Sequence, residues 1–146
     1  MITGVNHIAV MTEDLDRFVE FYTEVFDLEL VFTEQTPAFR HAILRTGASS
    51  WLHPAEVVDN GHGAASASMF DRGHLDHLAL TASDREAFSA ARERLVARGA
   101  SHGSVEDLGA FHSVWFTDPD GMQVELVVIV DDALTGIHAP RPLEPA

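Results

Sequence analysis

The chain has 146 residues, with 9 basic and 23 acidic side chains and a formal net charge of −14 at pH 7 when histidines are neutral. This acidic balance excludes the basic footprint that nucleic-acid binding needs. No apolar run approaches the roughly 18 residues of a membrane-spanning helix. The chain has no cysteine, which excludes disulfides and thiolate metal sites. No basic region precedes the first apolar stretch, so we expect no signal peptide and a cytoplasmic location by default.

The first half predicts a strand, a helix and three further strands. The stretch "GVNHIAV", which begins at Gly4, reads as an apolar strand and leads through a polar turn into the helix. Apolar residues then recur at helical spacing and form one stripe. The residues of this stripe are Leu15, Phe18, Val19, Tyr22 and Phe26. Three strand-like segments follow the helix and cover residues 28–32, 39–46 and 49–53.

The second half repeats this pattern. "HLDHLAL" begins at His74, and a shift of 70 residues places His7 on His77. Ser83 and Glu86 read as a capping box at the start of the second helix, and Gly99 reads as its C-terminal stop. The strand-like segments that follow cover residues 104–107, 112–117 and 122–130.

Each half therefore reads β-α-β-β-β, which predicts an α+β fold of two βαβββ modules within one structural domain. We place the first module at residues 1–58, a Gly-, Ala- and Ser-rich linker at 59–72 and the second module at 73–130. Residues 131–146, which are rich in proline, are expected to form an irregular tail.

Three residues of these strands are candidate metal ligands. Side chains alternate between the faces of a strand, so His7 and His77 point the same way in related units, opposite the bulky aliphatic neighbours. Glu125 lies inside an otherwise apolar strand, where a carboxylate is costly to bury without a partner. Two imidazoles and a carboxylate suit non-haem Fe(II), and also Zn, Ni, Co or Mn, with positions left open for substrate or water.

The other histidines divide into two weaker candidates and a remainder. Aligning "GASSWLHP" with "GMQVELVV" places Trp51 opposite Glu125, with His53 two residues on and on the same face as a further candidate ligand. His112 precedes a strand near the predicted pocket and is a candidate general acid or base. The remainder are expected on the surface or in loops: His41, His62, His74, His102 and His138.

Several aromatic residues are candidates to line a pocket for a small molecule. Packing in the core is the alternative role for the same side chains. The acidic charge could attract a cationic ligand, although a solvated acidic surface is its simpler meaning. The aromatic candidates are Trp51, Trp115, Phe39, Phe111 and Phe116.

The paired strands "NHIAV" and "DHLAL", with "FTDPDGMQVEL" near the end, resemble the vicinal oxygen chelate superfamily over about residues 4–130. That family includes glyoxalase I, extradiol dioxygenases, methylmalonyl-CoA epimerase, fosfomycin-modifying transferases and bleomycin-resistance proteins. The resemblance implies paired modules that form a curved, cup-like mixed sheet around a metal. It also implies a homodimer, with modules paired within or across subunits.

Carried over, the resemblance makes His7, His77 and Glu125 the ligands of one divalent metal. Glyoxalase-like members place a fourth ligand where this chain has Trp51, with His53 as a substitute. Extradiol dioxygenases have a tyrosine where Trp115 stands.

The predicted function is a metal-dependent enzyme of the glyoxalase or dioxygenase type. It acts on a small substrate that chelates the metal through neighbouring oxygens. Both lyase or isomerase chemistry and extradiol-type dioxygenation are open. The alternative is a bleomycin-resistance-like protein that binds and sequesters a small molecule.

Overall fold

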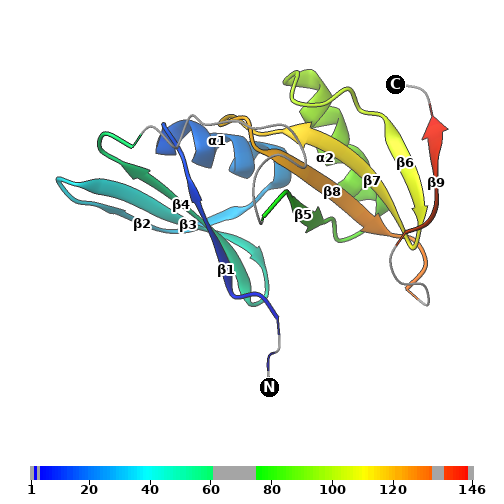
Figure 1. Cartoon of the computed structure of the whole chain (residues 1–146), viewed down its shortest axis with the longest axis horizontal. Helices are drawn as coiled ribbons and strands as arrows, with labels where there is room; N and C mark the ends of the chain where they lie inside the picture. The colour runs from blue at the N-terminus through cyan, green and yellow to red at the C-terminus, as the bar shows by residue number, and fades with distance from the viewer. Residues whose placement is uncertain (1, 3, 61–74, 133–136, 145–146) are drawn as a thin grey trace. The chain divides into compact units, whose positions relative to one another are not determined.

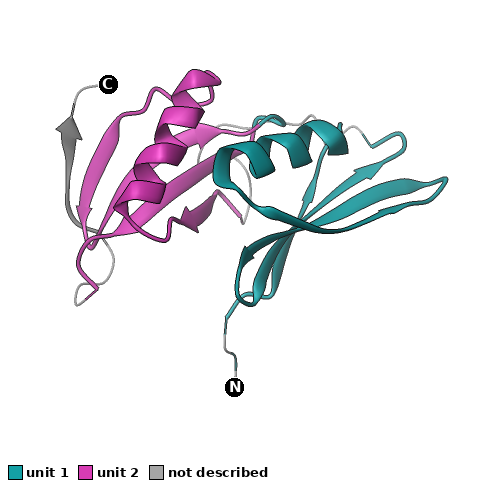
Figure 2. Cartoon of the chain, turned by 180° about the vertical axis from the view of Figure 1, so that it is seen from behind, with its two compact units in different colours: residues 1–66, 119–121 teal, residues 67–118, 122–146 magenta. Residues whose placement is uncertain are grey.

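The structure of the chain is a computed structural model. It describes residues 2, 4–60, 75–132 and 137–144, the last segment as backbone only. The chain divides into two compact units, shown in different colours in Figure 2. Unit 1 comprises residues 1–66 and 119–121, and unit 2 comprises residues 67–118 and 122–146. Most of the predicted linker, residues 59–72, falls outside the described residues.

Unit 1 contains one helix and a four-stranded mixed sheet (Figure 1). Its strands lie in the order β1-β4-β3-β2. The first strand pairs parallel with the last, and the other pairs are antiparallel. The elements are β1 (His7–Met11), α1 (Leu15–Phe26), β2 (Glu29–Gln35), β3 (Phe39–Gly47) and β4 (Ser50–Val57).

Unit 2 repeats this topology and adds one strand. Its strands lie in the order β5-β8-β7-β6-β9, and β5 again pairs parallel with β8. The predicted α+β fold of two βαβββ modules is therefore confirmed. The elements are β5 (Leu78–Thr81), α2 (Arg85–Ala97), β6 (Val105–Gly109), β7 (Phe111–Thr117), β8 (Gln123–Ile129) and β9 (Ile137–Glu144).

Each helix covers one face of the sheet in its own unit. The apolar stripe of α1, including Phe18 and Tyr22, is buried together with Leu44 and Leu52 of the sheet. In unit 2 the buried stripe of α2 contacts β8, and the core contains Phe88, Leu95, Val114, Phe116 and Val124. Because strand side chains alternate, the residues between these core positions project from the opposite face of each sheet.

The helix ends follow local sequence signals, with one shift from the prediction. Asp84 caps α2, because its Oδ1 accepts a hydrogen bond from the backbone N–H of Ala87 at 2.8 Å. The predicted cap at Ser83 is therefore one residue too early. Gly99 follows the helix with φ of +68°, a left-handed conformation that suits glycine, which confirms the predicted stop. Both described helices are too short and polar to cross a membrane.

The C-terminal tail contains a strand, which corrects the prediction of an irregular segment. Residues 137–144 form β9, which pairs antiparallel with β6 at the edge of the second sheet. Pro140 and Pro142 lie in this strand. Prolines suggested irregular chain, but an edge strand tolerates them because only one of its sides must pair with a neighbour.

We expect that Leu52→Ala lowers the free energy of unfolding by about 2–5 kcal/mol, because Leu52 of β4 is fully buried on the sheet face that α1 covers. Val31→Ala is the matched control, since Val31 is 43% exposed on β2 and should change stability by no more than about 0.5 kcal/mol. Urea titrations followed by tryptophan fluorescence measure both values. Equal losses in the two variants would show that the helix-facing side of this sheet is not the core.

Candidate metal centre

Glu125 on β8 is a buried carboxylate of unit 2. Only 6% of this residue is exposed. It lies opposite Ala79 of β5 on one side and opposite Trp115 of β7 on the other, so all three share the face away from α2. His77 immediately precedes β5, and its Nε2 lies 3.8 Å from Oε2 of Glu125. The structure therefore brings two of the predicted ligands together within one unit.

Neighbouring side chains fix the orientation of both groups. The Ser113 hydroxyl donates a hydrogen bond to Oε1 of Glu125, which leaves Oε2 toward His77. Nδ1 of His77 lies 2.8 Å from Oδ2 of Asp76. A carboxylate oxygen only accepts, so Nδ1 carries the proton and the lone pair of the neutral ring is on Nε2. That lone pair belongs to the nitrogen nearer Glu125.

His7 has the same arrangement in unit 1. Its Nδ1 lies 2.8 Å from Oδ1 of Asn6, an amide oxygen that accepts the N–H. The lone pair of His7 is therefore also on Nε2. The pairs Asn6–His7 and Asp76–His77 are related by the 70-residue shift of the repeat. Both histidines thus have the tautomer that offers Nε2 to a metal.

Strand register corrects the alignment between the two halves. Ala79 pairs with Glu125, whereas its repeat counterpart Ala9 pairs with His53. His53 therefore occupies the position of Glu125, and Trp51 lies one side-chain level away on the same face. Aligning the two glycines that precede these segments shifted the comparison by two residues. That shift preserves the face of a strand but not the partner.

His41 corrects another prediction, since it lies in β3 and its side chain is only 15% exposed. Its Nδ1 lies 2.8 Å from Nε2 of His53, and its Nε2 lies 2.8 Å from Oε2 of Glu34. Burial lowers the pKa of His53, and the neighbouring rings of His41 and His7 lower it further. The sequence did not predict the contact between His41 and His53, because this contact depends on the register between β3 and β4.

Each unit holds its own pair of candidate donors. Unit 2 contributes His77 and Glu125, and unit 1 contributes His7 and His53, whose ring centroids are 5.7 Å apart. Within residues 4–60 and 75–132, no three histidine, aspartate or glutamate side chains already form a metal-binding group.

The predicted pocket aromatics lie largely on the faces that carry these donors. Trp51 and Phe39 project from the first sheet on the same side as His7 and His53, as the pairing registers require. Trp115 and Phe111 do so in the second sheet, and the Trp115 ring packs edge-on against His77 at 4.8 Å between centroids. Phe116 differs, because it is buried in the core on the opposite face.

His112 projects from the face of the second sheet that α2 covers. Its sequence neighbours Phe111 and Ser113 project from the opposite face, which carries Glu125. His112 lines a cleft of about 300 Å³ together with Arg85 and Arg92 of α2. Burial lowers the pKa of His112, and the positive charge of Arg85 lowers it further. Its position separates it from Glu125, so we assign it no role at the candidate metal centre.

The remaining histidines do not join the candidate donors. His102 is exposed in a loop, as predicted, whereas His138 belongs to the backbone of β9. His62 and His74 lie outside the described residues.

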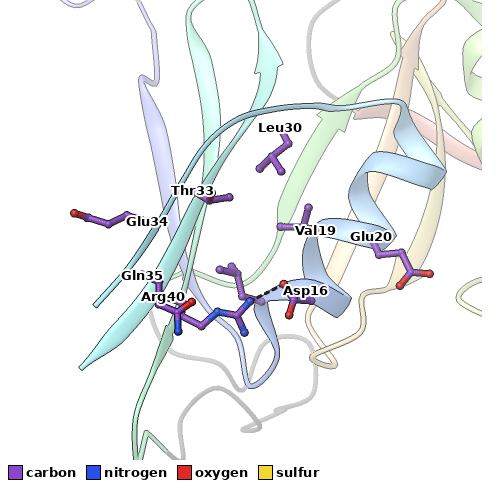
Figure 3. A pocket seen from close by; sticks show the side chains of 9 residues that line it. Asp16, Val19, Glu20, Leu30, Thr33, Glu34, Gln35 and Arg40 are labelled. Atoms are coloured by element: carbon purple, nitrogen blue, oxygen red, sulfur yellow. Dashed lines mark hydrogen bonds and ion pairs between the residues drawn. The ribbon is translucent and has the colours of Figure 1, made fainter. Parts of the chain in front are cut away.

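A second cleft, of about 370 Å³, lies between α1 and β2, where Arg40 pairs with Asp16 at 2.6 Å (Figure 3).

Comparison with solved structures supports the same fold. A glyoxylase/bleomycin resistance protein/dioxygenase domain from Frankia sp. EAN1pec is 22% identical, with a TM-score of 0.75 over 88% of this chain and 99% of that chain. A point mutant of the fosfomycin resistance protein FosX from Listeria monocytogenes is 22% identical, with a TM-score of 0.62 over 89% and 95%. That structure is a complex with Mn(II) and 1S,2S-dihydroxypropylphosphonic acid. FosX from Mesorhizobium loti is 23% identical, with a TM-score of 0.60 over 86% and 91%.

The family comparison covers most of the chain. The model of the glyoxalase family matches residues 4–126, which include both candidate histidine strands and Glu125. The chain therefore belongs to the Glyoxalase/Bleomycin resistance protein/Dioxygenase superfamily.

Proposed function

We propose that the chain is a metal-dependent enzyme that acts on a small substrate able to chelate a divalent metal through neighbouring oxygens. His7, His77 and Glu125 are the proposed ligands, with His53 as a fourth candidate. The main support for the proposal is that the same kind of hydrogen bond fixes the tautomer of both His7 and His77. In each, a side-chain oxygen of the preceding residue binds Nδ1–H and leaves the Nε2 lone pair available.

The chemistry of this donor set fits a divalent transition metal. Imidazole nitrogen and carboxylate oxygen together suit Fe, Zn, Ni, Co or Mn. Ligating histidines in metalloproteins usually donate their other N–H to a carboxylate or carbonyl oxygen, as Asp76 and Asn6 accept here. A bound metal would act as a Lewis acid that stabilises negative charge on a substrate oxygen. Ser113 and Asp76 would hold the ligand side chains in place.

The complex formed by one structural neighbour supports this substrate class. The ligand of the Listeria FosX mutant carries hydroxyl groups on adjacent carbons and is present together with Mn(II). Neighbouring oxygens of this kind can occupy two coordination positions of one metal. For this chain we propose the same chelating geometry of substrate, with lyase or isomerase chemistry and dioxygenation as the two reaction classes.

A second candidate function is the binding and sequestration of a small molecule without turnover. The placement of Trp51, Phe39, Trp115 and Phe111 on the donor-bearing faces favours it, because half-buried aromatic rings form apolar binding surfaces. Metal content separates the two candidates, since sequestration by aromatic contacts does not require the histidine ligands.

Metal analysis tests the proposal directly. After reconstitution with each candidate ion and removal of excess, we expect wild-type protein to retain metal. His7→Ala, His77→Ala and Glu125→Gln should lose it, because each removes one donor or its charge. His102→Ala is the control and should retain the wild-type content, since His102 is exposed in a loop. Equal and negligible metal in wild type and all variants would remove the basis of the enzyme proposal.

The residues behind the ligands give a second test. Asp76→Leu should weaken metal binding by about 10–100-fold, because His77 loses the acceptor that fixes its tautomer. Asp76→Asn should weaken it less, since Asn6 performs the same role for His7 with an amide oxygen. Asp132→Leu removes one exposed negative charge elsewhere in unit 2 and serves as the control. Titrations followed by calorimetry give the dissociation constants, and similar values for both leucine variants would contradict the positioning role.

A further inference from the structure

Glu34, His41 and His53 form a continuous hydrogen-bonded chain across the first sheet. Oε2 of Glu34 contacts Nε2 of His41, and Nδ1 of His41 contacts Nε2 of His53, each at 2.8 Å. The three residues come from three adjacent strands, β2, β3 and β4. They lie on the face away from α1, because Glu34 pairs directly with His41 and the flanking Ala42 is buried in the core.

The donor and acceptor roles in this chain follow from its carboxylate end. An ionised carboxylate only accepts, so Nε2 of His41 must carry a proton. A neutral His41 then has its lone pair on Nδ1 and accepts the hydrogen bond from Nε2–H of His53. A neutral His53, in turn, has its lone pair on Nδ1.

The other unit has a counterpart of this contact. Ser113 of β7 donates to Glu125 of β8, and the register makes Ser113 the counterpart of His41 and Glu125 the counterpart of His53. In both units, a residue on the third strand of the module thus binds the candidate donor on the last strand. It engages one polar atom of that donor and leaves the other available.

We propose that Glu34 and His41 are positioning residues that hold His53 as the Nε2–H tautomer, so that His53 presents the lone pair of Nδ1 to a ligand. In its use by a metal this inference rests on the proposed function, whereas the tautomer itself does not. His53 would then differ from His7 and His77, which present Nε2. The position that corresponds to Glu125 would be occupied by a neutral donor, which His41 connects to a carboxylate two strands away in the sheet.

Nitrogen-15 NMR of the full, metal-free chain at neutral pH tests the tautomers. Long-range correlations distinguish a protonated ring nitrogen from one with a lone pair. We expect both His41 and His53 to be protonated on Nε2 only. A doubly protonated His41 with a proton on Nδ1 of His53 would overturn the proposal, because the hydrogen bond between the rings would then run in the opposite direction.

Variants of Glu34 test its role. Glu34→Leu removes the acceptor, so both rings should show a mixture of tautomers. Glu34→Gln keeps an amide oxygen and should restore the wild-type spectrum. Glu29→Leu is the control, because Glu29 lies on the same strand and pairs with Arg45 at 2.8 Å, outside the chain of histidines. Glu34 is 51% exposed, so its replacement should leave the fold intact. Wild-type tautomers in Glu34→Leu would overturn the role of Glu34.

A variant of His41 and a metal titration complete the test. His41→Phe keeps an aromatic ring but removes the acceptor of the His53 N–H, so the His53 tautomers should become mixed. With Mn(II) or Zn(II), Glu34→Leu should weaken binding by about tenfold if His53 is a ligand. Unchanged metal affinity beside altered tautomers would overturn the use of His53 by a metal. Absence of metal binding in wild type would instead refute the proposed function, and the NMR result would still decide the tautomer.

Discussion

In each βαβββ module, the first strand lies parallel beside the last strand of that module, β4 or β8, and this pairing decides which side chains of the module can act together. The histidine strand would otherwise be separated from the last strand by a helix and two strands of sequence. Parallel pairing places Ala79 opposite Glu125 and Ala9 opposite His53, which brings His77 and His7 to the same sheet face as those residues. The helix on the other face takes the aliphatic side chains, so the polar donors are left on the face that the core does not use.

The two modules accommodate the polar candidate donor on β4 and on β8 in different ways. Unit 2 buries a carboxylate, whose desolvation is offset in part by a hydrogen bond from Ser113. Unit 1 places a neutral ring there and keeps the carboxylate of Glu34 half-exposed on β2, an edge strand. His41 connects the two, so the ring can be oriented by a charge that has not been desolvated. In the proposed metal site, the first arrangement would supply charge to a ligand, and the second would supply only a lone pair.

The sequence alone predicted the repeat, the order of elements and the residues on the donor face, because these depend on local periodicity. Period-two alternation put His7, His77 and Glu125 on the correct faces without any knowledge of pairing. The register between strands could not be predicted in the same way, because a shift of two residues leaves every side chain on its predicted face. The sequence alignment therefore matched Trp51 with Glu125, whereas the structure shows that His53 is the counterpart. The contact of His41 was missed for the same reason. His112 was misplaced because nearness in sequence to a pocket says nothing about the face from which a side chain projects.

Charge separates the two proposed functions more sharply than shape does. A divalent ion held by one carboxylate and neutral imidazoles retains a net positive charge, which favours substrates with anionic oxygens. Without a metal, Glu125 makes the same face negative and favours a cationic ligand, and the net charge of −14 would assist its approach. The surrounding field would slow an anionic substrate, so the metal-dependent function requires that local attraction outweigh long-range repulsion. Screening by physiological salt limits that repulsion to about 8 Å, whereas contact with the ion is not screened. The fixed Nε2 lone pairs of His7 and His77 are therefore the stronger indication, because they suit a cation that binds first and then recruits the substrate.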